Sequence, residues 1–233
     1  QGWFSKSDVK KGLRLPTGPS EELAEETGLH IGDGSMNRYR KKGREVGFYQ
    51  LRGDLHNDRD HYVQRIHGLF RNLYGIDVHL REMPSTGVYG FQIWSDALVD
   101  FKHEVLGLPL GKKGELHIPK CFLGDEKMER AFIQGWFDTD GTLYLENKRG
   151  KLYPRIEIAT TSRMLAREGT EVLKRHGFRT SVDRGRKGHE RWADLYKVCV
   201  RGDMMTRRWF ERIRPANRKQ WAKFERYVKY AEA

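Results

Sequence analysis

The residues best suited to chemistry in this sequence are two Asp-Gly pairs. Asp33 precedes Gly34 and Asp140 precedes Gly141, and the two pairs lie 107 positions apart. One Asp-Gly pair usually forms a turn, so a single copy would not indicate a site. Two copies in one register do, because carboxylates suit Mg²⁺, which often takes one or two of them together with a substrate phosphate. Asp33 and Asp140 are therefore candidate metal ligands and candidate catalytic residues.

The residues before each pair predict the helices that position them. Ala24 and Gly28 recur as Ala131 and Gly135 at the same offset of 107, one helical turn apart on one face. A glycine inside a helix costs about 1 kcal/mol relative to alanine, so close approach of two helices is the reason we give for it. Both aspartates would then emerge together at the negative ends of the helix dipoles. Carboxylates placed there repel each other unless divalent cations bind.

The same register continues along the chain and indicates two similar halves. Ser35 matches Thr142, and Asp96 matches Asp203. Each half shows the same order of patterns, which predicts an α+β fold of two pseudo-symmetric αββαββα repeats followed by a helix near 219–231. The expected helices and hairpins are 20–31, 36–55, 58–74, 76–94 and a helix capped by Asp96, then 125–138, 143–160, 162–176, 178–200 and a helix capped by Asp203.

We therefore divide the chain into four parts. Residues 1–19 are an N-terminal extension, 20–106 the first repeat, 107–124 a linker, and 125–233 the second repeat with the C-terminal helices. The linker contains Pro109, Gly111, Gly114 and Pro119, which interrupt any helical or strand period.

The charge of the chain indicates a polyanionic partner. Lys and Arg number 44 against 32 Asp and Glu, giving a formal net charge of +12. The cations gather in the expected hairpins of both halves, where Arg and Gln suit base edges and Lys suits phosphates. The predicted DNA-binding residues are Arg38, Arg40, Lys41, Lys42, Arg44, Gln50, Arg52, Lys148, Arg149, Lys151, Arg155, Arg184, Arg186, Lys187 and Arg191.

Several other classes of protein lack support in the sequence. No stretch approaches the roughly 20 apolar residues of a membrane span, and the first residues lack the apolar run of a secretory signal. Cys121 and Cys199 are too far apart in sequence for a disulfide scaffold or a C-x-x-C site. Lys112 lacks the surrounding residues of a phosphate-binding loop. We expect a soluble intracellular protein, cytoplasmic or organellar, that is not secreted and has no membrane partner.

At the two motif helices the chain resembles the LAGLIDADG homing endonucleases. Residues 26–34, Glu-Thr-Gly-Leu-His-Ile-Gly-Asp-Gly, resemble the first motif copy, and residues 133–141, Ile-Gln-Gly-Trp-Phe-Asp-Thr-Asp-Gly, the second. The first copy has Ile31 where the motif has its earlier Asp. The last Asp of each motif, which is the metal ligand in the family, is present in both copies. The resemblance covers the chain from about Ser20 onward and is greatest to single-chain, two-motif members found in archaeal introns.

The resemblance implies a fold and an activity. The fold is a saddle of two four-stranded antiparallel sheets on the DNA major groove, with the paired motif helices at its centre. The activity is Mg²⁺-dependent hydrolysis of double-stranded DNA by a monomer at a long target site, each acid serving one strand to give a staggered break. Mn²⁺ is expected to replace Mg²⁺, and Ca²⁺ to support binding without cleavage. The implied metal ligands are Asp33, Asp140 and the carbonyls of Gly32 and Thr139, and the expected assisting cation is Lys197, with Lys42 and Lys148 as alternatives.

Two other functions are compatible with the same fold. A non-cleaving DNA-binding regulator would typically have lost the motif acids, and both are present here. An RNA-binding intron maturase could grip RNA with the same basic sheets. The leading hypothesis is a site-specific DNA endonuclease, and a cleavage assay separates it from the other two.

Overall fold

The structure of the chain, a computed structural model, describes residues 4–41, 43–185 and 193–232. Within them lie two four-stranded antiparallel sheets, with strand orders β1-β2-β4-β3 and β5-β6-β8-β7. The predicted α+β fold, with one such sheet in each half, is confirmed. The strands are β1 (Gly34–Lys41), β2 (Arg44–Asp54), β3 (Arg81–Met83), β4 (Val88–Trp94), β5 (Gly141–Lys148), β6 (Lys151–Thr160), β7 (Thr180–Arg184) and β8 (Tyr196–Arg201).

Helices and strands come in the same order along the chain in both halves. None of the helices in the described ranges is long and apolar enough to cross a membrane. The first half has α2 (Glu21–Asp33), α3 (Arg59–His61), the π-helical η1 (Tyr62–Ile66), α4 (His67–Tyr74), η2 (Pro84–Thr86), α5 (Asp96–Asp100) and η3 (Phe101–Val105), preceded by α1 (Lys6–Lys10). The second has α6 (Glu126–Asp140), α7 (Arg163–Arg175), α8 (Asp203–Arg212) and α9 (Arg218–Ala231), preceded by η4 (Lys120–Phe122).

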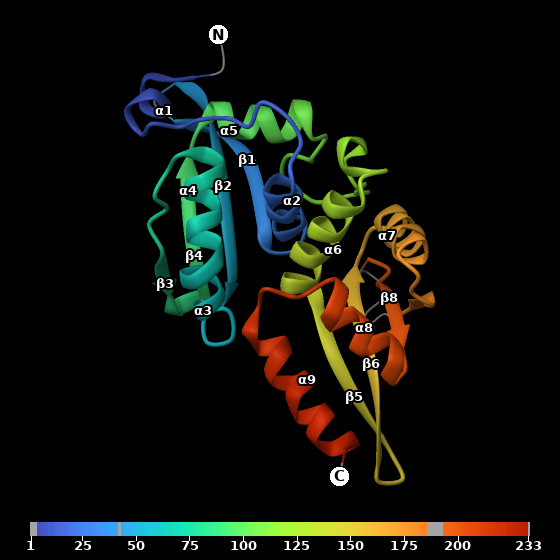
Figure 1. The fold of residues 1–233 in the computed structure, drawn as a ribbon. Coiled ribbons are helices and arrows are strands. Elements are labelled where there is room, and N and C mark those ends of the chain that lie inside the picture. The colour runs from blue at the N-terminus through green and yellow to red at the C-terminus, as the bar shows by residue number, and fades with distance from the viewer. Residues whose placement is uncertain (1–3, 42, 186–192, 233) are drawn as a thin grey trace.

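Helices α2 and α6 lie side by side at the centre, with one sheet to each side of them (Figure 1). Their glycines allow the two backbones to touch. A Cβ added at Gly28 would lie 2.7 Å from the amide nitrogen of Trp136, and one at Gly135 would lie 2.9 Å from that of Leu29. Any larger residue at either position would therefore force the helices apart.

Both central helices continue two residues beyond their predicted ends and finish at the aspartates. Asp33 is the last residue of α2 and Asp140 the last of α6. Gly34 and Gly141 begin β1 and β5 with φ of −83° and −97°, so neither Asp-Gly pair is a turn. Both positions are too crowded for a larger residue, since a Cβ added at Gly34 or at Gly141 would lie 2.7 Å from an atom of the residue four positions earlier. Each pair is thus a direct helix-to-strand joint.

The third helix of each repeat is capped differently from the prediction. Ser95, and not Asp96, is the N-cap of α5, and its hydroxyl accepts a hydrogen bond from the amide three residues later at 3.1 Å. Asp96 instead accepts a hydrogen bond from the Gly47 amide at 2.6 Å, which ties α5 to β2. Gly202 precedes α8 without a side-chain cap, so Asp203 is not the cap there either.

Each sheet buries one face under helices and leaves the other open. Tyr49 and Leu51 of β2 are fully buried, and exposure along this strand alternates residue by residue. Ile156 and Ile158 of β6 are fully buried in the same way. Because successive side chains of a strand point to opposite faces, the residues between them belong to the open faces.

The segment that follows each repeat returns to the centre and covers a sheet edge. The Gly111 amide donates to the carbonyl of Met36 on β1 at 2.8 Å. In the second half the side chain of Gln220 accepts from the Leu143 amide at 3.1 Å and donates to the Gly141 carbonyl at 2.9 Å. These contacts satisfy free edge groups of β1 and β5, and they bring the residues next to Gly111 and Gln220 close to the ends of α2 and α6.

Candidate active site

Asp33 and Asp140 lie at adjacent helix ends. A Cβ added at Gly32, next to Asp33, would be 3.3 Å from Cγ of Asp140. On its other side Asp33 faces Gly53, where a Cβ would lie 2.9 Å from carboxylate oxygens of both Asp33 and Asp58. The two central helices therefore place their terminal carboxylates together, with a third carboxylate close by.

The surroundings of both aspartates favour the protonated form. Burial, and then the carboxylates of Asp58 and Asp140, raise the pKa of Asp33 to about 7. Burial raises the pKa of Asp140 to about 6, against the lowering effect of Lys113 and Lys219. The Asp140 side chain nevertheless keeps an exposed surface, so this shift reflects atoms crowded around the carboxyl and not complete exclusion of solvent. Carboxylates held in this way gain stability from a bound cation.

Lys113 occupies the C-terminal end of α2. Its Nζ donates to the backbone carbonyls of His30, Ile31 and Gly32 at 3.0, 2.6 and 2.8 Å. These are among the last carbonyls of the helix, which lack partners within it and carry the negative end of its dipole. Burial lowers the pKa of Lys113 to about 8, while Asp140 and Asp33 oppose that shift.

Lys219 is the second lysine beside the two aspartates. Its Nζ donates to Oδ1 of Asp58 at 2.5 Å, and the Asn217 side chain donates to the same atom at 2.8 Å. Asn217 also donates to the backbone carbonyl of Asp138 at 3.1 Å. The start of α9 is thus joined to both halves beside the aspartates.

Neither lysine is among the site residues predicted from the sequence, although the sequence contains a signal for them. Pro109 precedes Lys113 by four positions, and Pro215 precedes Lys219 by four. The two segments correspond at an offset of 106, and this one-residue shift removes them from the register of 107 that relates the motif helices.

Lys197, the expected assisting cation, lies elsewhere. It is on β8, and its Nζ donates to Oε2 of Glu157 at 2.8 Å. In the part of the chain that the structure describes, the lysines whose charges act on Asp33 and Asp140 are Lys113 and Lys219. Lys113 and Lys219 are therefore the lysines beside the two aspartates, and Lys197 lies on the second sheet. Of the alternatives, Lys148 is at the distal end of β5 and Lys42 lies outside the described residues.

The residues at the centre fit a hydrated divalent cation. Asp33 and Asp140 offer carboxylate oxygens, and residues 4–41, 43–185 and 193–232 contain no cluster of three or more His, Cys, Asp or Glu that could hold a metal. Two carboxylates are compatible with Mg²⁺, which takes one or two of them and keeps several waters. The Gly32 carbonyl, a predicted ligand, already accepts a hydrogen bond from Lys113. Thr139 packs against Gly32, because a Cβ added at Gly32 would lie 2.5 Å from the Cβ atom of Thr139.

Most of the predicted DNA-binding residues that can be placed lie on the open faces of the sheets. Strand alternation and cross-strand pairing assign them to the face opposite the buried residues of β2 and β6. The residues so placed are Lys41, Arg44, Gln50 and Arg52 in the first sheet, and Lys148, Lys151 and Arg155 in the second, where Lys197 also lies.

Three predicted base readers lie on the helix-covered side instead. Arg38 forms an ion pair with Asp100 at the end of α5, and Arg40 follows it two residues later on the same side of β1. Arg184 on β7 bonds to Asp194 at 2.7 Å. Their strand parity is opposite to that of the open face, so the structure does not place them with the other predicted contacts.

The remaining predicted DNA-binding residues are assigned to neither face of a sheet. Arg149 is in the β5–β6 turn with a positive φ of 52°. Lys42, Arg186, Lys187 and Arg191 lie outside the described residues.

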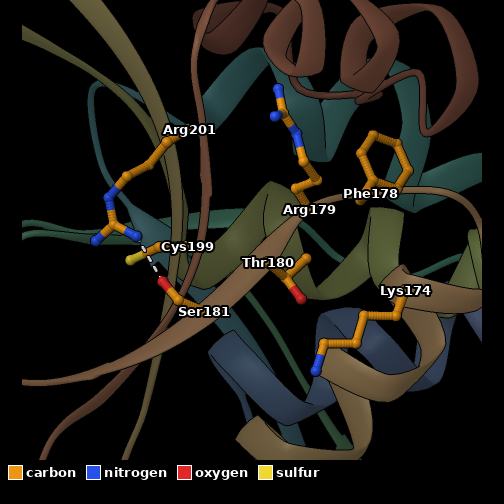
Figure 2. A pocket seen from close by; sticks show the side chains of 7 residues that line it. All are labelled: Lys174, Phe178, Arg179, Thr180, Ser181, Cys199 and Arg201. Atoms are coloured by element: carbon orange, nitrogen blue, oxygen red, sulfur yellow. Dashed lines mark hydrogen bonds between the residues drawn. The ribbon is translucent and has the colours of Figure 1, made fainter.

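A basic hollow of about 610 Å³ lies where β7 and β8 meet the end of α7 (Figure 2). Lys174, Arg179 and Arg201 contribute its three cations, and Arg201 donates to the hydroxyl of Ser181 at 2.5 Å. The hollow is lined by neither motif aspartate, so it is a surface feature of the second sheet and not part of the acidic centre.

The chain matches a protein family that agrees with the resemblance seen in the motif residues. Residues 127–228 match the family described as the LAGLIDADG-like domain. The resemblance inferred from the sequence is therefore confirmed, with the match placed on the second repeat.

Two archaeal relatives match longer stretches of the chain. An A-type ATP synthase subunit of Pyrococcus abyssi is 27% identical over 195 residues, covering 83% of this chain and 17% of that protein. An uncharacterized protein of Methanocaldococcus jannaschii is 25% identical over 182 residues, covering 75% of this chain and 61% of that protein. The chain thus spans less than two thirds of the length of either relative.

Solved structures of two homing endonucleases share the fold. I-DmoI in complex with DNA and Mn superposes with a TM-score of 0.58 at 18% identity, covering 83% of this chain and 96% of that one. The LAGLIDADG homing endonuclease I-GzeII in complex with its DNA target gives a TM-score of 0.60 at 11% identity, covering 91% and 90%. At these identities the likeness establishes the two-sheet LAGLIDADG fold.

Proposed function

We propose that this chain, which has the LAGLIDADG fold and carries a LAGLIDADG-like domain, is a site-specific endonuclease for double-stranded DNA. The observation that carries the proposal is the acidic centre. Asp33 and Asp140 end two paired helices, between two sheets whose open faces are rich in Lys and Arg. A protein that only binds DNA gains nothing from two adjacent carboxylates, which repel the phosphates.

The aspartates hold the metal in this proposal. Asp33 and Asp140 each supply carboxylate oxygens at the end of one helix, and the exposed surface of Asp140 leaves room for a phosphate to approach. When bound there, Mg²⁺ supplies an activated water and Lewis-acid stabilisation of the charge on the scissile phosphate. Mn²⁺ replaces it, and Ca²⁺ supports binding alone. I-DmoI structures obtained with Mn and with Ca lend support to a divalent ion in this fold.

The two lysines hold positive charge beside the carboxylates. Lys113 is fixed by three carbonyls and Lys219 by Asp58, so neither ammonium has to be ordered when DNA arrives. A pre-positioned cation stabilises negative charge that develops in the transition state. The first repeat and the linker after it supply Asp33 and Lys113, and the second repeat supplies Asp140 and Lys219. This division suits cleavage of one strand by each half and a staggered break. Since one chain supplies both halves, a monomer is sufficient.

Cleavage of a bound target tests the proposal. Duplexes selected from a randomised pool in Ca²⁺ would be placed in a supercoiled plasmid and incubated with Mg²⁺. We expect linearisation by the protein, and loss of linearisation with retained Ca²⁺-dependent binding for Asp33→Asn and Asp140→Asn. Asp77→Asn is the matched control, because Asp77 is an exposed partner of Arg71 away from the centre.

The outcomes separate the three functions. Unchanged cutting by both Asp→Asn variants would contradict the assignment of the centre. Binding of the plasmid without any cleavage would indicate a DNA-binding regulator. Binding of structured intron RNA in preference to every selected duplex would indicate a maturase.

A further inference from the structure

The open face of the first sheet carries three aromatic rings to which the proposed function gives no role. Tyr39 of β1, Phe48 of β2 and Trp94 of β4 form this aromatic cluster. The ring centroids of Phe48 and Trp94 are 4.7 Å apart, and that of Tyr39 lies 5.6 Å and 6.2 Å from them. Tyr39 is 48% exposed and Trp94 is 37% exposed. Large apolar side chains gathered on an open face mark an interaction surface.

The cluster lies at a definable distance from the acidic centre. Tyr39 is six residues beyond Asp33 along β1, which at about 3.3 Å per residue is about 20 Å. Base pairs of B-DNA rise about 3.4 Å each, so the cluster would lie about six base pairs from the cut. It therefore belongs to the outer part of one half of the target.

The packing of the rings determines what they can contact. Phe48 is inclined to Trp94 by 56° and to Tyr39 by 73°, so the rings cover one another's faces. The Lys41 ammonium lies 4.4 Å from the centroid of the Trp94 ring and covers it further. Rings packed edge to face in this way favour contacts through their edges over stacking of bases on their faces. In the major groove the apolar group that matches these edges is the C5-methyl group of thymine.

The second repeat has different chemistry at the same positions. At the offset of 107, Tyr39 corresponds to Glu146, Phe48 to Arg155, and Trp94 to Arg201. The pairing is equivalent, since Phe48 faces Trp94 across β2 and β4, and Arg155 faces Arg201 across β6 and β8. Both arginines also form ion pairs, Arg155 with Glu157 and Arg201 with Asp183, so a base must displace these carboxylates before the guanidinium groups contact the O6 and N7 atoms of guanine.

We propose that the aromatic cluster reads thymine methyl groups in one half of the target, and that Arg155 and Arg201 read guanine at the equivalent place in the other half. This inference rests on the proposed DNA-binding function. It makes the target asymmetric at about the sixth base pair on each side of the centre.

Selection with variants locates the two readers. Duplexes would be selected in Ca²⁺ from a randomised pool by the wild-type protein, Phe48→Ala and Arg155→Ala. Phe48→Ala is expected to relax a thymine preference in one half only, and Arg155→Ala a guanine preference in the other half only. Both side chains are on an open face, and thermal melting confirms that the variants fold. Relaxed preference at the same positions in both variants would overturn the proposal.

Removal of the methyl groups is the direct test. Thymines at the positions that depend on Phe48 would be replaced by deoxyuridine, which keeps the pairing and lacks the methyl. Wild-type affinity should fall about fourfold for each methyl removed. Phe48→Ala should bind both duplexes equally, and Phe48→Leu, which keeps an apolar side chain, should retain part of the difference. Equal wild-type affinity for the two duplexes would overturn the inference.

The experiments distinguish failure of the methyl readout from failure of the proposed DNA-binding function. A protein that binds a selected duplex and ignores the deoxyuridine exchange retains DNA binding and lacks methyl readout. A protein that binds no duplex fails both. If single-stranded nucleic acid is preferred, and Phe48→Ala abolishes that preference, the cluster stacks bases and the methyl readout is wrong.

Discussion

Lys113 and Lys219 approach the aspartates from segments that follow the two repeats. Lys113 bonds to three carbonyls at the end of α2, and Lys219 bonds to Asp58 beside Asp33. Lys113 offsets the negative end of the α2 dipole, and Lys219 offsets the charge of the Asp58 carboxylate. The same two charges are available to the phosphate that the proposed reaction cleaves.

Replacing either lysine should separate binding from cleavage. Lys113→Met and Lys219→Met are expected to slow plasmid cleavage on the order of 100-fold, because a pre-positioned charge is lost from the transition state. Affinity for the selected duplex in Ca²⁺ should change little. Lys112→Met, at an exposed neighbouring position, serves as the control. Wild-type cutting rates in both variants, with a large loss for Lys197→Met, would reverse the assignment.

Gly28 offers a test of the contact between the central helices. Gly28→Ala places a Cβ 2.7 Å from the Trp136 amide, so we expect a loss of about 2 kcal/mol or more in the free energy of unfolding. Gly68→Ala, in α4, has no atom within 4 Å of the added Cβ and should stabilise the protein by about 1 kcal/mol. Urea unfolding measures both, and equal effects would contradict the close helix contact.

His61 should make the stability of the protein depend on pH. Burial lowers its pKa to about 4, although Asp58 acts in the other direction, and neither ring nitrogen has a hydrogen-bond partner among the described residues. In the unfolded chain the group titrates near pH 6.5, so the unfolded state takes up the proton first as the pH falls. Stability should therefore decrease between about pH 6.5 and pH 4, by about 3 kcal/mol.

Comparison with His61→Leu isolates this contribution. The raised pKa of Asp33 acts with the opposite sign, since its stabilising effect is present at low pH and is lost as the pH rises to about 7. Both proteins contain Asp33, so the difference in their unfolding free energies, measured in urea across this range, reports His61. A difference that does not vary with pH would contradict the assignment.

At the scale of elements, the repeat was the part of the fold that the sequence could predict. The offset of 107 relates α2 to α6, and the alternating pattern of Arg155 to Ala159 marks a strand within β6. The faces of the hairpins were not predictable, because the face of each residue depends on which residues the turn pairs. Arg38 is an example. Its pairing with Gly47 places its side chain on the helix-covered face of the sheet, where it forms an ion pair with Asp100.

The two faces of the first hairpin should respond differently to mutation. Arg44→Ala, on the open face, is expected to weaken DNA binding and to reduce the salt dependence of the affinity by about one unit of slope. Arg38→Ala should leave affinity and slope unchanged and cost about 1 kcal/mol or less of stability through its partly exposed ion pair. Titrations at several salt concentrations test this, and equal slopes for the two variants would refute the assigned parity.

At the scale of the whole molecule, the two halves depend on one another. The central helices bury each other's backbones, and the Asn217 side chain joins Asp58 of the first half to Asp138 of the second. The linker adds a further link, since the Leu116 amide donates to the hydroxyl of Ser162, the N-cap of α7, at 2.9 Å. These contacts cross the boundary between the halves at several places.

We expect the described domain to unfold as one cooperative unit. Calorimetry should show one transition whose calorimetric and van't Hoff enthalpies agree, because neither half can open without exposing the α2–α6 contact. Gly135→Ala should lower the temperature of that single transition. Two separate transitions in the wild-type protein would show that the halves are energetically independent.

The three carbonyl contacts of Lys113 have a consequence for protein engineering. They make the segment after the first repeat a component of the centre, and not a passive tether between the halves. A chimera that exchanges one half for that of another protein must therefore place its junction after Lys113, so that this lysine travels with α2. Replacing residues 107–113 with a flexible Gly-Ser connector would preserve both sheets and both aspartates and still remove one of the two cations.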